Sequence, residues 1–100
     1  MIQSVYYPIP KPGVVWRIVD GEAVLVLPAK GEVKVLNEVG ARIWSLADGT
    51  HTIHDISVSI SAEYAVDQGQ AEIDTLDFIN QLANKGILTL SNQPSQRMGE

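Results

Sequence analysis

The fold is decided by residues 31–44, which read GEVKVLNEVGARIW. Within Glu32–Leu36, apolar and polar side chains alternate through Val33, Lys34 and Val35, as in a strand with one buried face. Asn37 follows directly, and its side-chain oxygen can accept a backbone N–H of a first helical turn. The stretch therefore predicts a strand that passes into a helix without a loop.

The helix expected to begin at Asn37 carries its apolar residues at three- and four-residue spacing. Val39, Ile43 and Leu46 lie on one face. We expect the helix to stop at Asp48-Gly49, because glycine readily takes the left-handed conformation of a helix C-terminal cap.

Two further strands are expected before this stretch. Residues 14–19 are rich in β-branched and aromatic side chains, and residues 22–27 follow after Asp20-Gly21, a pair typical of tight hairpin turns. The second strand is apolar from Ala23 to Leu27, which predicts a middle strand covered on both faces. The simplest arrangement is an antiparallel meander with residues 32–36 at one edge, where unpaired N–H and C=O groups can accept another strand.

After the stretch, the pattern predicts a helix over residues 52–64, a helix over residues 67–84 and a short strand or wing over residues 87–90. Thr52 and Asp55 have nearly the spacing and chemistry of a capping box, and Lys85-Gly86 ends the last helix. The fold class is therefore α+β and resembles a winged helix-turn-helix: a three-stranded antiparallel meander followed by three helices.

The last helix has more apolar surface than one core contact needs. Two neighbouring stripes run along it, one of Ile73, Leu76, Ile79 and Ala83 and the other of Ala71, Thr75, Phe78 and Leu82. Together they cover roughly 180°, whereas about 100° is typical of a surface helix. Two explanations stay open. Either one side packs on the other helices and the other on the sheet, or part of the second stripe lines the floor of a groove.

The composition limits the classes of function that the chain can have. Of its 100 residues, 45% are apolar and 19% are charged, which indicates one globular domain. The absence of cysteine excludes disulfides, thiolate catalysis and cysteine-bound metals. The sequence has no run of about 18 apolar residues and no signal peptide, so we expect a cytoplasmic protein that does not enter a membrane. The formal net charge of −5 disfavours nucleic-acid binding, which usually requires a basic surface.

The two ends of the chain are expected to lie outside the domain, which spans residues 14–90. Residues 1–13 contain three prolines and predict an extended arm rather than a regular element. The arm is either a poorly ordered lead-in or packs Tyr6 and Tyr7 on this domain or on a second copy. Residues 91–100 are polar and predict a disordered tail. The arm and the open strand edge would also permit a homodimer through strand or arm exchange.

No combination of side chains indicates catalysis. His51 and His54 are three residues apart, but a metal site needs about three protein ligands, and His51 precedes the expected helix. The serines have no obvious base partner, and the glycines do not form a phosphate-binding pattern. Asp74 and Asp77 lie on the polar face of the last helix, where solvated acids are ordinary. We therefore expect no catalytic residue, no metal and no cofactor.

Residues 31–53 resemble the PqqD family, the small peptide-recognition domains of pyrroloquinoline quinone and other ribosomal-peptide biosynthesis pathways. The family's pattern is a strand ending in x-L-N, a helix of small and large apolar residues, and then DG-x-x-[ST]-[IV]. Leu36-Asn37, Asp48-Gly49 and Thr52-Ile53 match this pattern. Residues 73–88 fit the family's last helix and its closing x-G-[IL]-[IL].

The resemblance covers residues 14–90 and implies a function. Such domains bind the leader part of a precursor peptide and present it, as a peptide chaperone, to a modifying enzyme, often a radical S-adenosylmethionine enzyme. The leader adds as a strand alongside residues 32–36 and lies against the last helix. The peptide-binding residues implied here are Val33, Lys34, Val35, Leu36, Thr75, Phe78, Leu82 and Lys85. Lys85 would face an acidic leader residue.

Independently of the resemblance, strand addition requires an open strand edge and an apolar surface beside it, and the sequence offers both. For Val33 and Val35 individually, burial in the core is an equally good interpretation.

Two other classes of function stay open. A winged-helix DNA-binding protein would need a basic recognition helix, whereas the last helix has Glu72, Asp74 and Asp77 against Lys85, three acids and one base, or −2. The second alternative is a small interaction subunit of another enzyme complex. The pathway, whether pyrroloquinoline quinone or another, is also open at this point.

Overall fold

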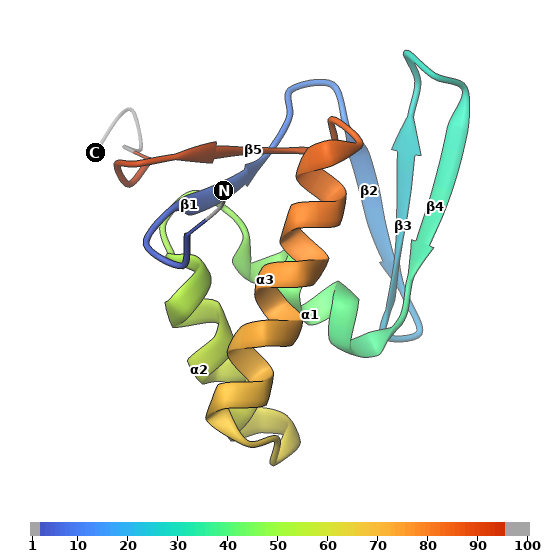
Figure 1. The fold of residues 1–100 in the computed structure, drawn as a ribbon. Coiled ribbons are helices and arrows are strands. Elements are labelled where there is room, and N and C mark those ends of the chain that lie inside the picture. Colours follow the sequence, from blue (N-terminus) through green and yellow to red (C-terminus); the bar gives the residue numbers. More distant parts are fainter. Residues whose placement is uncertain (1–2, 96–100) are drawn as a thin grey trace.

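The computed structural model describes residues 3–95 of the chain. The elements follow one another as β1 (Tyr7–Pro10), β2 (Val15–Val19), β3 (Glu22–Leu27), β4 (Glu32–Leu36), α1 (Glu38–Leu46), α2 (Ile53–Tyr64), α3 (Gln68–Asn84) and β5 (Leu88–Ser91) (Figure 1). Between residues 3 and 95, no helix is long and apolar enough to cross a membrane.

The strands β2, β3 and β4 form an antiparallel meander in which β4 is one of the two edges (Figure 1). Asp20 and Gly21 make the turn between β2 and β3, and their φ angles of +52° and +82° are those that a type I′ hairpin turn requires. The predicted meander, its hairpin and its edge strand are confirmed. With the three helices that follow, they make up the predicted α+β, winged helix-turn-helix-like fold.

The meander buries only one of its faces. Ala23, Leu25 and Leu27 of β3 are buried on the side of the helices. The opposite face consists mostly of valines, which are exposed or half-buried: Val15, Val19, Val24, Val26, Val33 and Val35. The prediction that β3 is covered on both faces is therefore wrong, because no element in the part of the chain that the structure describes packs on this valine face.

The helix α1 begins where its cap residue predicts. Asn37 Oδ1 accepts the N–H of Gly40 at 2.8 Å, which confirms Asn37 as the N-cap. The helix ends at Leu46, however, with Ala47 as its C-cap, so the predicted stop at Asp48-Gly49 is wrong. Gly49, in the turn after α1, has a positive φ of +87°, and its N–H donates to Pro8 O at 2.9 Å, which joins this turn to β1.

The capping box of α2 is confirmed. Thr52 Oγ1 accepts the N–H of Asp55 at 3.0 Å, and Asp55 Oδ2 accepts the N–H of Thr52 at 3.1 Å. The end of α3 is also as expected, with Gly86 at φ +76° and the N–H of Ile87 donating to Leu82 O at 2.9 Å.

The helix α3 packs against α2 and β5 through a face that consists mostly of the second predicted stripe. Its buried residues are Ala71, Thr75, Ile79 and Leu82. Ile73, expected in the first stripe, is 62% exposed. The core-facing side of α3 therefore comprises Ala71, Thr75 and Leu82 of the second stripe with Ile79 of the first, while Phe78 is half-buried.

The N-terminal arm contains a regular strand, which corrects the expectation of an arm without one. Strand β1 pairs antiparallel with β5, so residues far apart in sequence form a second, two-stranded sheet (Figure 1). Proline is compatible with β1 because the backbone of Pro8 faces away from β5, toward Gly49. The segment also completes the start of α2, since Tyr6 O accepts the N–H of Ile53 at 3.0 Å.

Residues 87–90 were expected to form a strand or wing, and β5 shows that they form a strand that pairs with the arm instead of the meander. Of the predicted disordered tail, Ser91 belongs to β5 and the N–H of Ser95 donates to Gly49 O at 2.7 Å. Residues 1–2 and 96–100 lie outside the described residues. The exchange of the arm or of a strand between two copies stays a prediction.

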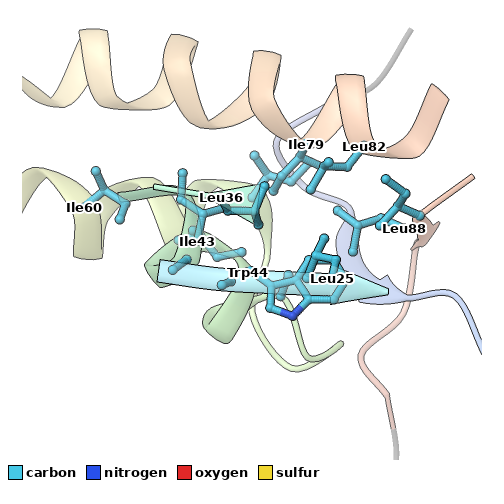
Figure 2. Close-up of a cluster of buried hydrophobic side chains, with 14 of the residues drawn as sticks. Leu25, Leu36, Ile43, Trp44, Ile60, Ile79, Leu82 and Leu88 are labelled. Atoms are coloured by element: carbon cyan, nitrogen blue, oxygen red, sulfur yellow. The ribbon is translucent and has the colours of Figure 1, made fainter. Parts of the chain in front are cut away.

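One hydrophobic core joins the sheet, the helices and β5. Figure 2 shows Leu25 of β3, Ile43 and Trp44 of α1, and Ile79 and Leu82 of α3 turned toward one another. The ring of Trp44 also meets that of Trp16 edge-to-face, with their centroids 5.4 Å apart. This core holds α3 at a fixed distance from β4 and so determines the shape of the surface between them.

Candidate functional site

A groove with a cavity of about 330 Å³ lies between β4 and α3, at the open edge of the meander. We call it the edge groove. Strand β4 contributes Lys34, Val35 and Leu36 to it, and the first turns of α1 contribute a wall that includes Val39 and Ile43. The groove therefore combines a strand with an unpaired edge and a surface of side chains beside it.

The α3 side of the edge groove is a single helical stripe. It consists of Asp74, Phe78, Gln81, Leu82 and Lys85. From Asp74 to Lys85 the helix rises by about 16 Å, at about 1.5 Å per residue. An extended chain covers that length with about five residues, at about 3.3 Å each. The groove is thus long enough for one short strand.

The edge groove is apolar in the middle and charged toward its ends. Phe78 is half-buried and Leu82 is buried, and both line the groove between Asp74 and Lys85. Lys34 of β4 also lines it. Lys85 therefore places a positive charge at one end of the groove, and Asp74, eleven residues earlier in the chain, places a negative charge at the other end.

Gly40 is a groove residue that the sequence analysis did not single out. A Cβ at this position would lie 3.1 Å from Phe78 Cζ and 3.3 Å from Leu36 Cβ, so the glycine leaves room for the Phe78 ring to reach α1. A glycine inside a helix costs about 1 kcal/mol relative to alanine, which is the signal that could have pointed to a packing reason.

Six of the residues implied by the resemblance line the edge groove: Lys34, Val35, Leu36, Phe78, Leu82 and Lys85. Two others do not. Val33 is on the valine face and is 65% exposed, so it is neither a core residue nor part of the groove lining. Val35 is 57% exposed, so it is not a core residue either.

Thr75 was expected beside Phe78 and Leu82, and this placement is wrong. It is 0% exposed, because α3 turns Thr75 toward the core together with Ala71 and Ile79. Thr75 therefore cannot touch a ligand in the groove without a rearrangement of the core.

Two of the ion pairs among the described residues join helices, and the third, between His51 and Asp48, lies in the turn after α1. Arg42 of α1 makes a two-pronged contact with Glu63 of α2, at 2.8 and 2.9 Å, which raises the pKa of Arg42 and lowers the pKa of Glu63. His54 of α2 meets Glu72 of α3 at 3.0 Å. Hydrogen bonds from the Ser4 hydroxyl and then from His54 lower the pKa of Glu72. These pairs hold the helices to one another and leave the edge groove free.

The two histidines do not come together as metal ligands. Nδ1 of His51 lies 3.1 Å from Leu46 O and 3.3 Å from Asp48 Oδ1, whereas His54 faces Glu72. Between residues 3 and 95, no group of three or more histidine, aspartate or glutamate side chains is placed to hold a metal ion.

Both the sequence and the fold of this chain resemble those of known proteins. A family model described as coenzyme PQQ synthesis protein D (PqqD) matches residues 22–88. The structure of TbiB1 in complex with the TbiA(β) leader peptide is similar, with 39% sequence identity and a TM-score of 0.75. The match covers 80% of this chain and 93% of the TbiB1 chain.

Two further solved structures share the fold. Lasso peptide synthetase B1 complexed with the leader peptide has a TM-score of 0.76 at 24% identity, covering 83% of this chain and 98% of that chain. The PqqD truncation of Methylobacterium extorquens PqqCD, described as a stand-alone recognition element for ribosomally synthesized and post-translationally modified peptides, has a TM-score of 0.68 at 26% identity. It covers 82% of this chain and 87% of that chain. No curated protein matches the chain.

Proposed function

This chain belongs to the PqqD family, and we propose that it binds the leader region of a ribosomally made precursor peptide and presents it to a modifying enzyme. The observation that carries the proposal is the edge groove, in which an open strand edge runs beside a partly apolar helix face. This protein binds the peptide, and the partner enzyme carries out the covalent chemistry.

The leader adds to β4 as a further strand. Its backbone pairs with the free N–H and C=O groups along the outer side of Glu32–Leu36, which gives affinity for any extended chain. Successive side chains of the added strand point to opposite faces. One set enters the edge groove between β4 and α3, and the other set continues the valine face beside Val33 and Val35.

The selection of leader side chains falls to α3. Half-buried Phe78 offers an apolar contact in the middle of the groove, where the buried Leu82 also lines it, and Lys85 offers a positive charge at its end. Lys34, Val35 and Leu36 line the groove on the side of β4 and belong to the segment with which the leader backbone pairs. Val33 contributes only its backbone. Thr75 has no part in this contact because it is buried and does not line the groove.

The structures of relatives support leader binding. TbiB1, which is 39% identical, was solved with a leader peptide bound. The partner enzyme is one that modifies ribosomally made peptides, and a radical S-adenosylmethionine enzyme, as in pyrroloquinoline quinone biosynthesis, is one candidate. Because such precursors are made on ribosomes, we place this binding in the cytoplasm.

An NMR titration tests the proposal. The ¹⁵N-labelled protein is mixed with the synthetic leader of any short precursor peptide encoded near its gene. We expect amide shifts confined to β4, the start of α1 and the Asp74–Lys85 side of α3. Shifts confined to β1, β5 or the exposed side of α2, or no shifts at all, would contradict leader binding in the edge groove.

A further inference from the structure

A second cavity, of about 320 Å³, lies at the end of α3 where the edge groove also ends. It is built by the connection between β1 and β2, the turn between β3 and β4, and the residues that follow α3. Lys85 lines both cavities, so the second cavity adjoins the edge groove. We call it the lysine pocket.

The lysine pocket has an apolar floor and a basic rim. Leu27 and Ile87 are buried at its base, and the side chains of Lys11, Lys30 and Lys85 are exposed around it. No acidic side chain is among its lining residues. This combination suits a ligand that carries both an apolar group and carboxylates.

Two hydrogen bonds, one between backbone groups and one from a side chain, hold the lysine pocket in shape without a ligand. The N–H of Lys11 donates to Ile87 O at 2.9 Å, which fixes the first segment to the end of α3. Nζ of Lys30 donates to Lys85 O at 2.7 Å, which fixes the turn between β3 and β4 to the same point. A ligand therefore meets a preformed site and loses little affinity to ordering the protein.

The charge of the pocket is contrary to that of the whole chain. The chain has a net charge of −5 and four lysines, and three of them surround the lysine pocket while the fourth, Lys34, lines the adjoining groove. Among the ion pairs of residues 3–95, none involves these lysines. Basic residues gathered in this way raise the local concentration of an anionic partner and select its orientation.

We propose that the lysine pocket binds an acidic segment of the leader peptide, next to the residues that pair with β4. The apolar side chain of this segment contacts Leu27 and Ile87, and its carboxylates face Lys11, Lys30 and Lys85. This inference rests on the proposed function and adds a second recognition element to it. The two contacts lie on one peptide, so the second is made at a high effective concentration once the strand has docked.

The test compares two peptides and three proteins by fluorescence anisotropy. The probes are the synthetic leader of any short precursor peptide encoded near the gene and the same leader with each Glu and Asp outside the pairing strand changed to Gln and Asn. The proteins are wild type, Lys11→Glu and Arg17→Glu. Lys11 lines the lysine pocket but not the edge groove, whereas Arg17 lies on the opposite edge strand and makes the same change of charge.

We expect Lys11→Glu to weaken binding of the natural leader about fivefold, and Arg17→Glu to weaken it less than about twofold. The neutralised leader should bind wild type less tightly than the natural leader does. Its affinities for wild type and for Lys11→Glu should be equal. The natural leader's affinity should also fall as salt is raised, because exposed charges are screened.

The inference is overturned if the natural leader binds but the neutralised leader binds equally well, if Lys11→Glu and Arg17→Glu have equal effects, or if the leader has no acidic residue outside the strand. If neither peptide binds wild type at all, the proposed function itself fails. The two failures are therefore distinguishable.

Discussion

Gly40 couples the local structure of α1 to the shape of the edge groove. We predict that Gly40→Ala weakens leader binding, because the new Cβ would lie 3.1 Å from Phe78 Cζ and the ring must shift within the groove. The free energy of unfolding should change little, since the gain of about 1 kcal/mol in helix propensity offsets the tighter contact. Urea unfolding and calorimetric titration with the leader measure the two effects separately.

Gly69→Ala is the matched control, because a Cβ at Gly69 meets only Asp67 Oδ2, at 3.2 Å, and Gly69 does not line the groove. Undiminished affinity in Gly40→Ala would mean that the position of the Phe78 ring has no part in binding.

Ala65 is the C-cap of α2 and has φ +55°, a left-handed conformation that glycine adopts more easily than alanine. We predict that Ala65→Gly stabilises the protein by about 0.5 kcal/mol. Ala62→Gly, at an exposed position inside the same helix, should instead destabilise it by about 1 kcal/mol. Thermal unfolding of both variants checks the opposite signs, and a destabilised Ala65→Gly would show that the left-handed alanine is not strained.

At the scale of elements, β4 matters because its outer edge is unpaired. We predict that Val35→Pro abolishes leader binding, because proline removes a backbone N–H and resists the pairing of a further strand. Titration with the leader gives the affinity, and circular dichroism shows whether the variant is folded. A folded variant with wild-type affinity would place the docking site elsewhere.

The elements whose signals are local could be predicted from the sequence. Asn37, Thr52 with Asp55, and Asp20-Gly21 each act on backbone groups within a few residues, and all three features are present in the structure. The pairing of β1 with β5 could not be predicted in this way. It joins Tyr7 to Ser91, and its partner choice depends on tertiary packing.

The sequence predicts the β4 side of the site better than the α3 side, because the orientation of α3 depends on tertiary packing. Lys34, Val35 and Leu36 follow from the edge position of β4, and Phe78, Leu82 and Lys85 do line the groove. Thr75 is buried because most of the second stripe of α3 faces the core, and packing against α2 and β5, not the local sequence, decides that orientation. The valine face was missed for the same reason, since apolar residues on both sides of a strand predict burial whether or not a partner covers them.

At the scale of the whole molecule, carboxylates paired between or beside the helices make stability depend on pH. Burial raises the pKa of Asp48, but hydrogen bonds from Thr50 outweigh that effect and leave it below its ordinary 3.8. Glu63 and Glu72 also have pKa values below their ordinary 4.5. The unfolded state therefore binds more protons at low pH, so the stabilisation is present above these ordinary values and is lost as the pH falls through the folded pKa values.

We predict that the free energy of unfolding decreases from about pH 6 to about pH 3, and that Glu63→Gln flattens this dependence by removing one of the three groups. Urea unfolding at several pH values measures it. A constant or rising stability on acidification would contradict the assignment of these pairs.

The charge distribution also belongs to this scale. The chain is acidic overall, but its four lysines all line the edge groove or the lysine pocket. They form one basic region beside the end of α3. The valine face lies on the other side of the same sheet, and a leader strand added to β4 would extend that face.

The most direct test of the central claim is amide hydrogen exchange of Glu32–Leu36 with and without the leader, followed residue by residue by NMR. If the leader adds as a strand, the outward-facing amides of β4 should gain protection on binding, while those of β2, the opposite edge, stay unchanged. Binding of the leader with no new protection along β4, or with protection along β2 instead, would contradict strand addition at this edge.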